Sequence, residues 1–419
     1  MVGRPARMPF VPIPILGAGL TGLSAALALQ RRGASCRVFE RAAGVGGHAS
    51  TVEERGYRFD CTGHLLHLRS EELRAEVLGW LDGQCVELER RSVVYSHGVY
   101  TRYPYQANTH GLPPAVAYEC LLGFLSAREK PERVPKNFEE YCLFNFGEGF
   151  SRHFMLPYNE RLFGVPLNQL TSDWCERFVP RPKLEDVLAG AVGLPDRRLG
   201  YNARFLYPRG GIGELPAAMA RGVQNLALRA APVAIRGARR ELVFERELVG
   251  YERLVSTIPL PALLDLFDEL PPAVRRARAK LRVSELYYLD VALSGPAKKD
   301  FHWAYVPEPR FPFYRVGHYS AFSPELAPPG CSSLYIELAA RTRFDLEREM
   351  PEVVRGLVEL GLIAGPSEID FVRLRHLSHA YVLYDHAHAG ALATIEAFLA
   401  ENRVISTGPG MSWLRPRRR

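Results

Sequence analysis

Three glycines near the amino terminus have the spacing of a phosphate-binding turn. They are Gly17, Gly19 and Gly22, in the order Gly-Ala-Gly-Leu-Thr-Gly. Gly17 permits a tight turn, Gly19 lets the backbone approach a pyrophosphate, and Gly22 lets a following helix pack closely against a strand. Glu40, further along the chain, could accept hydrogen bonds from ribose hydroxyls. The pattern predicts a dinucleotide site.

The residues around these glycines predict the elements that such a site needs. Residues 11–16 are expected to form a buried strand, residues 23–32 a helix, and residues 35–39 a second strand that ends at Glu40. The amino terminus of the helix offers free N–H groups and a partial positive charge to phosphates. The apolar stretch 10–29 contains three glycines and two prolines, so a strand and a helix explain it better than a membrane segment.

Charge and cysteine content bound the class of protein. The 419 residues are 47% hydrophobic and 24% charged, as in an ordinary globular protein rather than a disordered chain. The net charge is +7, but four of the 53 basic residues lie in the last five positions, which leaves 49 against 46 acidic residues. We therefore expect no nucleic-acid partner and no membrane association. Seven scattered cysteines without a C-x-x-C spacing favour a reducing, cytoplasmic location.

The residues after Glu40 distinguish between kinds of dinucleotide. Glu40-Arg41 is followed by a second glycine turn, Gly46-Gly47-His48, which resembles the turn along the FAD pyrophosphate in amine-oxidase-like flavoproteins. Tyr-Pro-Arg-Gly-Gly-Ile-Gly at 207–213 and Leu-Val-Ser-Thr at 254–257 resemble segments of the same group. The resemblance implies a FAD domain built from the start, the middle and the end of the chain.

Four further segments narrow the resemblance to one family. They are Arg-Tyr-Pro-Tyr-Gln-Ala-Asn at 102–108, Pro-Tyr-Asn-Glu-Arg-Leu-Phe at 157–163, Trp-Cys-Glu-Arg at 174–177 and Phe-Pro-Phe-Tyr-Arg at 311–315. In this order and spacing they resemble UDP-galactopyranose mutase, and its eukaryotic-type branch more closely than the common bacterial one. The similarity extends from about Ile15 to Gly408.

This resemblance implies an isomerase that interconverts the pyranose and furanose forms of a UDP-hexose, with UDP-galactose as the first candidate and no net redox change. In that family reduced FAD is the active form. Its N5 attacks the anomeric carbon and displaces UDP, and the sugar opens and recloses as a flavin adduct. The implied partner is a nucleotide sugar, and the implied role is the supply of galactofuranose for cell-surface polysaccharide biosynthesis.

The resemblance also assigns roles to individual residues. Arg177 and Arg315 would hold the diphosphate, because arginine can give two charge-assisted hydrogen bonds to one phosphate. The main chain of His64 would lie near flavin N5, which completes the expected catalytic set. The expected substrate-binding residues are Tyr103, Gln106, Asn159, Phe163, Trp303, Tyr305 and Tyr381. The expected cofactor-binding residues are Gly17, Gly19, Leu20, Thr21, Gly22, Glu40, Arg41, Gly47, His48, Gly63, His64, Val233 and Gly408. No metal is expected, because His67 follows His64 without a third ligand.

The chain departs from the family pattern after residue 407. Family members continue with Gly-Arg-x-Gly-Ser-Trp-x-Tyr and a terminal helix, whereas residues 408–414 read Gly-Pro-Gly-Met-Ser-Trp-Leu and an arginine tail follows. Pro409 replaces the family arginine, Arg415 replaces a phosphate-binding tyrosine, and Phe322 stands where a tyrosine is usual. These changes keep open a degenerate, non-catalytic nucleotide-sugar binder.

A true oxidoreductase on the same fold, such as an amine or protoporphyrinogen oxidase relative, is the other alternative. It would yield hydrogen peroxide or a reduced acceptor. An amine or porphyrin substrate has no use for a pair of diphosphate-binding arginines, so the segments that contain Arg177 and Arg315 favour the mutase.

The predicted fold class is α/β, with three parts. They are a discontinuous Rossmann-type FAD domain (8–80, 203–265 and 386–419), a helical substrate domain (105–200) and an antiparallel sheet domain (85–104 and 268–385). Strands of that sheet are expected at 286–293, 333–338 and 370–375. A helix is expected to begin after Asn137, with Glu140 completing a capping box. Substrate would lie where the three parts meet.

Overall fold

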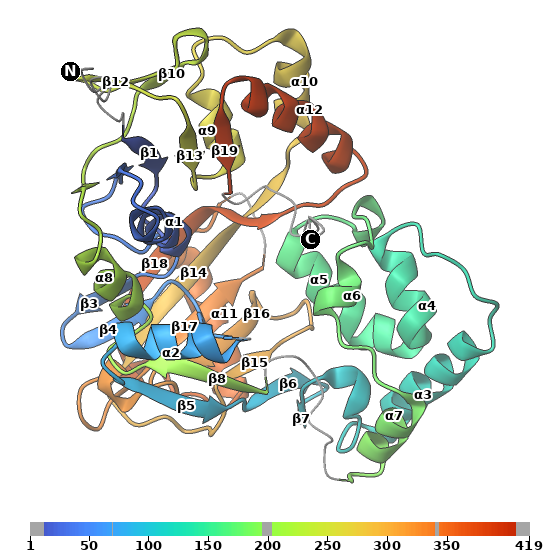
Figure 1. The fold of residues 1–419 in the computed structure, drawn as a ribbon. Helices are drawn as coiled ribbons and strands as arrows, with labels where there is room; N and C mark the ends of the chain where they lie inside the picture. Colours follow the sequence, from blue (N-terminus) through green and yellow to red (C-terminus); the bar gives the residue numbers. More distant parts are fainter. Residues whose placement is uncertain (1–11, 69, 195–202, 340–342, 408–419) are drawn as a thin grey trace, which may run out of the picture.

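The computed structural model describes residues 12–68, 70–194, 203–339 and 343–407. It shows a mixed α/β protein with a parallel nucleotide-binding sheet, a larger sheet and a separate group of helices (Figure 1). The predicted fold class is confirmed. In the described part of the chain, no helix has both the length and the apolar character that crossing a bilayer requires.

The nucleotide-binding sheet gathers strands from distant parts of the sequence. Its five parallel strands lie in the order β19-β13-β1-β2-β9. Their bounds are β1 (Ile13–Leu16), β2 (Cys36–Phe39), β9 (Leu226–Ala227), β13 (Leu254–Ser256) and β19 (Val404–Ser406). Helix α1 (Leu20–Arg31) begins three residues before the predicted start, because Gly19 is already its N-cap. Both faces of this sheet are covered, which is why its strands read as continuous apolar runs.

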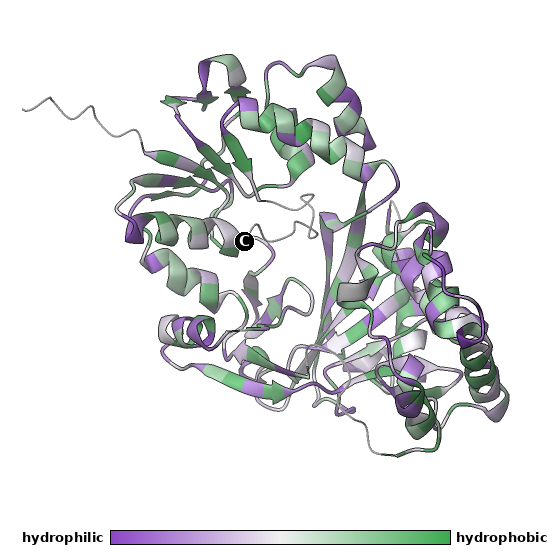
Figure 2. Cartoon of the chain, turned by 45° about the vertical axis from the view of Figure 1, so that its right-hand side comes forward, coloured by the Kyte–Doolittle hydropathy of each residue, from purple (hydrophilic) through white to green (hydrophobic). Residues whose placement is uncertain are grey.

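Helices cover the two faces of the parallel sheet. On one face α1 packs with α2 (Glu71–Trp80) and α8 (Glu214–Arg221). On the other face lie α9 (Leu260–Asp265), α10 (Pro272–Lys280) and α12 (His388–Glu401). Hydrophobic residues recur along the parallel strands and these helices (Figure 2). Two small sheets adjoin them, formed by β3 (Thr51–Glu54) with β4 (Tyr57–Asp60), and by β10 (Ala234–Arg236), β11 (Glu241–Val243) and β12 (Leu248–Gly250).

The larger sheet has seven strands in the order β18-β14-β17-β16-β15-β6-β7. Their bounds are β6 (Ser92–Ser96), β7 (Val99–Arg102), β14 (Val283–Leu293), β15 (Trp303–Tyr305), β16 (Phe313–His318), β17 (Ser332–Leu338) and β18 (Ile369–Val382). The three predicted strands are confirmed as β14, β17 and β18, and β14 and β18 are longer than predicted. Alternate residues of β14 face opposite sides, with Leu286 and Tyr288 toward the helical group and Leu289 and Val291 toward α11 (Leu346–Glu359).

Two details of the predicted antiparallel domain are wrong. β6 and β15 run parallel, so the sheet is mixed. Residues 85–89 form β5 (Cys85–Glu89), which pairs with β8 (Arg204–Pro208) in a sheet of its own rather than joining the large sheet. Both pairings join segments that are far apart in sequence, so no local pattern specifies them.

The helical group fills residues 105–191 and packs on the large sheet through a cluster rich in phenylalanine and tyrosine. Its helices are α3 (Pro114–Arg128), α4 (Phe138–Phe150), α5 (Leu156–Phe163), α6 (Cys175–Phe178) and α7 (Leu184–Ala191). As predicted, α4 begins after Asn137, whose side chain accepts a hydrogen bond from the N–H of Glu140 at 2.9 Å. The Glu140 carboxylate binds the N–H of Lys136 instead of closing the box on Asn137.

A buried carboxylate ties the elements around the glycine turns together. Asp60, at the end of β4, accepts hydrogen bonds from Thr51 Oγ1 (2.6 Å), Tyr207 OH (2.5 Å) and the N–H of Ile212 (3.1 Å). Burial raises the pKa of Asp60 to about 6, although the three donors oppose the shift. The carboxyl group of Asp60 therefore joins the β3–β4 hairpin to the segment 207–212.

A second buried carboxylate extends this connection to the large sheet. Tyr319 OH lies 2.7 Å from the main-chain oxygen of Asp60 and 2.9 Å from Asp290 Oδ1 on β14, so its one proton is shared between the two acceptors. Arg375 Nε on β18 donates to Asp290 Oδ2 at 2.9 Å. Burial raises the pKa of Asp290 to about 6 against the effect of Arg375. The nucleotide-binding part and the large sheet are thus joined through polar groups as well as through apolar packing.

We predict that Asp60→Asn lowers stability most in acid. Below pH 4 both side chains are neutral, and the amide leaves one buried donor without an acceptor, at a cost of about 1–3 kcal/mol. The pKa of Asp60 is about 6 in the folded protein and 3.8 in the unfolded chain. Protonation of Asp60 therefore stabilises the unmodified protein fully below pH 3.8, and this stabilisation is lost as the pH rises through about 6. The deficit of the variant should shrink between pH 4 and pH 8 in urea denaturation. Asp300→Asn, in an exposed ion pair with Arg91, is the control, and a deficit that grows with pH would contradict the raised pKa.

Candidate functional site

A cleft of about 640 Å³ lies at the carboxyl ends of the parallel strands. The turn after β1, the residues after β2 and residues 257–259 after β13 all line it. His64 and two residues of β18, Ser378 and His379, also face it. Open α/β sheets bind ligands outside the carboxyl ends of their strands, so this is the expected place for a dinucleotide.

The first glycine turn is too crowded for any side chain. Gly17 has φ +98°, and a Cβ there would lie 2.5 Å from Thr257 Oγ1. A Cβ on Gly22 would lie 1.9 Å from the carbonyl oxygen of Gly17. The first turn of α1 has no acidic residue and no side-chain cap, so its N–H groups stay available to a phosphate.

Glu40 and Arg41 bring opposite charges to the same end of the cleft. Glu40 accepts hydrogen bonds from the N–H groups of Ala18 and Ala42, both at 2.8 Å, and each oxygen keeps a lone pair for a ribose hydroxyl. Arg41 has no hydrogen-bond or ion-pair partner among residues 12–68, 70–194, 203–339 and 343–407. The cleft thus combines a fixed acceptor for ribose with a cation that is available to a diphosphate.

The structure places most of the predicted cofactor residues in this cleft. Those that line it are Gly17, Gly19, Leu20, Thr21, Glu40, Arg41, Gly47, His48 and His64. Gly22 does not line the cleft but packs against the carbonyl of Gly17 in the turn. Gly63 packs against Tyr335, whose OH would lie 2.4 Å from a Cβ at that position. Val233 is 59% exposed and follows the lining residue Pro232 without lining the cleft itself. Gly408 is outside the described residues.

Sequence reasoning missed several lining residues. They include Ala230, Ala231, Pro232, Ala262, Leu266, Ser378 and His379. Most are small or apolar and carry no motif. Ser378 and His379 reach the cleft from the large sheet, so only the three-dimensional arrangement could reveal them.

Arg315 is held by a carboxylate that the sequence analysis did not identify. On neighbouring strands, Arg315 Nε and Nη2 donate to Glu337 Oε2 and Oε1 at 2.9 and 2.5 Å. Burial alone would lower the pKa of Arg315, but Glu337 and Tyr381 raise it well above its usual value. A buried ion pair of this kind fixes the guanidinium, and Tyr381 makes a further side-chain hydrogen bond with it.

An aromatic wall adjoins Arg315. The ring of Tyr305 lies 4.6 Å from that of Tyr103 and 6.5 Å from that of Trp303, and Tyr158 contacts it at 5.3 Å. Tyr158 is also close enough to Arg315 to affect its pKa. The structure therefore brings predicted substrate residues from two separate segments, Tyr103 and the strand with Trp303 and Tyr305, to one place.

Other predicted substrate residues border this wall. Phe163 contacts Tyr381 at 6.1 Å. Gln106 donates to the carbonyl of Pro180 at 2.7 Å, and Asn159 donates within its own helix to Met155 at 2.6 Å. Arg177 belongs to α6, but its side chain is outside the described part of the structure.

Two buried polar atoms near the wall, Gln106 Oε1 and Trp303 Nε1, have no hydrogen-bond partner among the described residues. Buried polar groups are nearly always paired in folded proteins, so orphaned ones beside a fixed cation point to a polar ligand. His64 connects this region to the cleft, since it lines the cleft and interacts electrostatically with Glu337 and Arg315.

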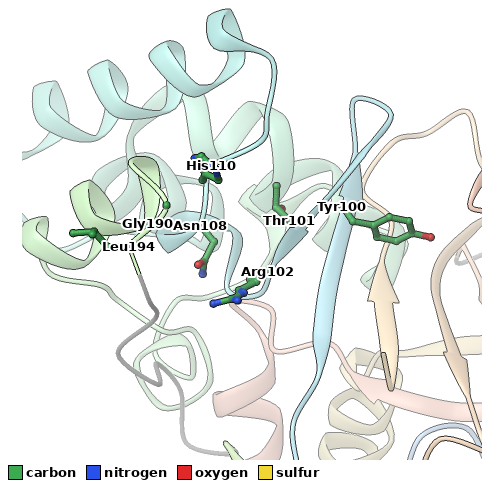
Figure 3. Close-up of a pocket in the computed structure, with 8 residues that line it drawn as sticks. Tyr100, Thr101, Arg102, Asn108, His110, Gly190 and Leu194 are labelled. Carbon is green, nitrogen blue, oxygen red and sulfur yellow. The ribbon is translucent and has the colours of Figure 1, made fainter. Parts of the chain in front are cut away.

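A second hollow of about 350 Å³ lies between β7 and the carboxyl end of α7. Figure 3 shows Arg102, Asn108 and His110 gathered on one side of it, while the side chain of Tyr100 points away. Within segment 102–108, Arg102 and Asn108 face this hollow, whereas Tyr103 belongs to the aromatic wall. Within the described part of the chain, no group of three or more His, Cys, Asp or Glu residues could hold a metal ion.

Comparison with known proteins extends these observations. Residues 15–78 match the family described as NAD(P)-binding Rossmann-like domain. A crystal structure of reduced UDP-galactopyranose mutase superimposes with a TM-score of 0.87 at 26% identity, over 94% of this chain and 88% of that one. The chain is a structural relative of UDP-galactopyranose mutase. The predicted resemblance is confirmed, and the eukaryotic-type branch stays a prediction.

Oxidoreductases share the fold at lower identity than the mutase. A protein assigned as a protoporphyrinogen oxidase from Exiguobacterium sp. 255-15 matches with a TM-score of 0.72 at 16% identity, covering 96% of this chain and 94% of that chain. A double mutant of putrescine oxidase matches at 0.63 and 14%, covering 95% and 93%. These neighbours show the shared fold. The match to the mutase and the Rossmann domain support a flavoenzyme with FAD as its cofactor, and the cleft fits that group.

We predict that Gly22→Ala weakens FAD binding. The added methyl group would overlap the carbonyl of Gly17, so α1 must shift away from the phosphates. The dissociation constant should rise about tenfold or more, or about 1.4 kcal/mol, in a flavin fluorescence titration. Gly79→Ala in α2 is the matched control, because a Cβ there meets open space. Equal affinities for the two variants would refute the role of the close contact.

Proposed function

We propose that this protein is a flavin-dependent mutase that interconverts the pyranose and furanose forms of a UDP-hexose, with UDP-galactose as the first candidate. The observation that carries the proposal is Arg315, a cation fixed by buried Glu337 and bordered by an aromatic wall, next to a cleft that fits FAD. The similarity to UDP-galactopyranose mutase over nearly the whole chain supports it.

The residues of the chain divide the work of such a reaction. Reduced FAD, when bound, would supply the nucleophile that accepts the sugar. Arg315 would hold the diphosphate throughout, because its pKa stays far above neutrality and its fork is fixed by Glu337. That contact stabilises UDP as a leaving group and keeps it in place for the return step.

The aromatic wall would exclude water and orient the substrate. Tyr103 and Tyr305 would contact apolar parts of the base and sugar, and Trp303 Nε1 is a donor without a hydrogen-bond partner among the described residues. Exclusion of water matters because an activated sugar is otherwise hydrolysed. His64 would act at the junction of cofactor and substrate through its main chain.

The same site argues against an amine oxidase. A cationic amine beside Arg315 would be repelled, and Glu337 is already engaged by that arginine. The oxidoreductase neighbours are at most 16% identical to this chain and share its fold.

Incubation with UDP-galactopyranose and FAD tests the proposal. We expect the furanose form to appear only after dithionite reduction, with no net oxidation, as followed by anion-exchange chromatography. Hydrogen peroxide or a reduced acceptor as product would favour an oxidoreductase. Binding of the nucleotide sugar without turnover would favour a non-catalytic binder.

We predict that Arg315→Ala lowers kcat/KM through loss of a charged phosphate contact. The decrease should correspond to a loss of about 2–4 kcal/mol in transition-state stabilisation. Arg315→Lys is the companion variant, because it keeps a cation beside Glu337 but lacks the planar fork. It should retain FAD affinity and still lose activity. A loss of tenfold or less in both variants would contradict the role of Arg315.

A further inference from the structure

Strand β18 carries an irregularity where it passes the cofactor cleft. Ser284 of β14 pairs with Tyr381, and Leu286 pairs with Leu377. Four residue steps on β18 therefore span two steps on β14, so the segment 378–380 bulges out of the ladder. Bulges redirect side chains and are common beside active sites.

The bulge directs two side chains into the cleft that holds the glycine turns. Ser378 and His379 line it together with Gly17 and His48. Ser378 Oγ and His379 Nδ1 are 3.0 Å apart, which fixes the ring and leaves Nε2 as the other polar atom. His48 follows the second glycine turn and is close enough to His379 for the charge of His379 to lower the pKa of His48.

The charges around His379 leave a positive excess in the cleft. Arg278 is engaged by Asp265 at 2.8 Å, and Glu285 is engaged by His376 at 2.8 Å. Arg41 has no such partner among the described residues.

Burial is the main cause that lowers the pKa of His379, and the positive charges of Arg278 and Arg41 lower it further. Burial is also the main cause that lowers the pKa of His48, and the neighbouring His379 adds to the effect. Both imidazoles are therefore neutral at neutral pH before the cofactor binds.

We propose that His379, carried into the cleft by the β18 bulge, and His48 take up protons when the FAD diphosphate binds, so that cofactor affinity rises as the pH falls. The proposal rests on FAD being the cofactor. A diphosphate stabilises an imidazolium nearby, which raises the pKa of the bound state above that of the empty state. Between these two values binding consumes protons, and linkage requires tighter binding at lower pH.

FAD titrations of the full chain between pH 5.5 and pH 8 test the proposal. Flavin fluorescence gives the dissociation constant, and calorimetry in two buffers of different ionisation enthalpy gives the protons taken up. A rise of one unit in the pKa of a single histidine makes binding up to about tenfold tighter at the acid end of the range.

His379→Gln removes the titratable group and keeps hydrogen-bonding capacity. At pH 8 both side chains are neutral, so the affinity of the variant at that pH is the reference for its pH series. At pH 5.5 it should bind more weakly and take up fewer protons. The double variant with His48→Gln should lose most of the pH dependence, because His64 is then the histidine that still lines the cleft. His376→Gln is the control, since His376 is on the same strand but does not line the cleft.

The outcomes separate this proposal from the proposed function. If His379→Gln keeps the pH dependence and proton uptake of the unmodified protein, the proposal is overturned while FAD binding stands. Affinity that does not change with pH overturns it in the same way. Failure to bind FAD at every pH would overturn both the proposal and the flavoenzyme assignment.

Discussion

The shared carboxylate of Asp60 sets the geometry on which the site depends. It receives donors from the β3–β4 hairpin and from the turn after β8, and its main-chain oxygen binds Tyr319 of the large sheet. The loop that carries His64 begins immediately after it. Cofactor cleft and aromatic wall are therefore held at a constant separation by one polar cluster. Apolar packing between the two parts could slide, but hydrogen bonds that converge on a buried anion have a single arrangement.

The parts of the structure that the sequence predicts are those encoded by local pattern. The spacing of Gly17, Gly19 and Gly22 predicts strand, turn and helix, since each glycine meets a specific steric demand. The α4 cap and three strands of the large sheet also follow from short-range signals. The family segments place Tyr103, Tyr305 and Arg315 at one site, and the structure brings them together.

What the sequence did not predict depends on contacts between distant segments. Glu337 has no motif, and only its register opposite Arg315 on the neighbouring strand identifies it. The pairing of β5 with β8 and the bulge at His379 are likewise properties of strand register. Asn159 is predicted to contact the substrate, and its Nδ2 donates to the carbonyl of Met155. A residue type suits a role, but its neighbours decide whether the polar atom is free.

The order of strands in the parallel sheet has a consequence for biosynthesis. β13 lies between β1 and β19, and β19 is more than a hundred residues after β13 in the chain. A ribosome therefore releases the glycine turn long before the last strand of its sheet exists. During that interval the edge of β13 is open, and pairing between remote strands is slow. Early occupancy of the cleft by cofactor would stabilise the partly assembled sheet, which makes flavin supply a factor in the yield of folded protein.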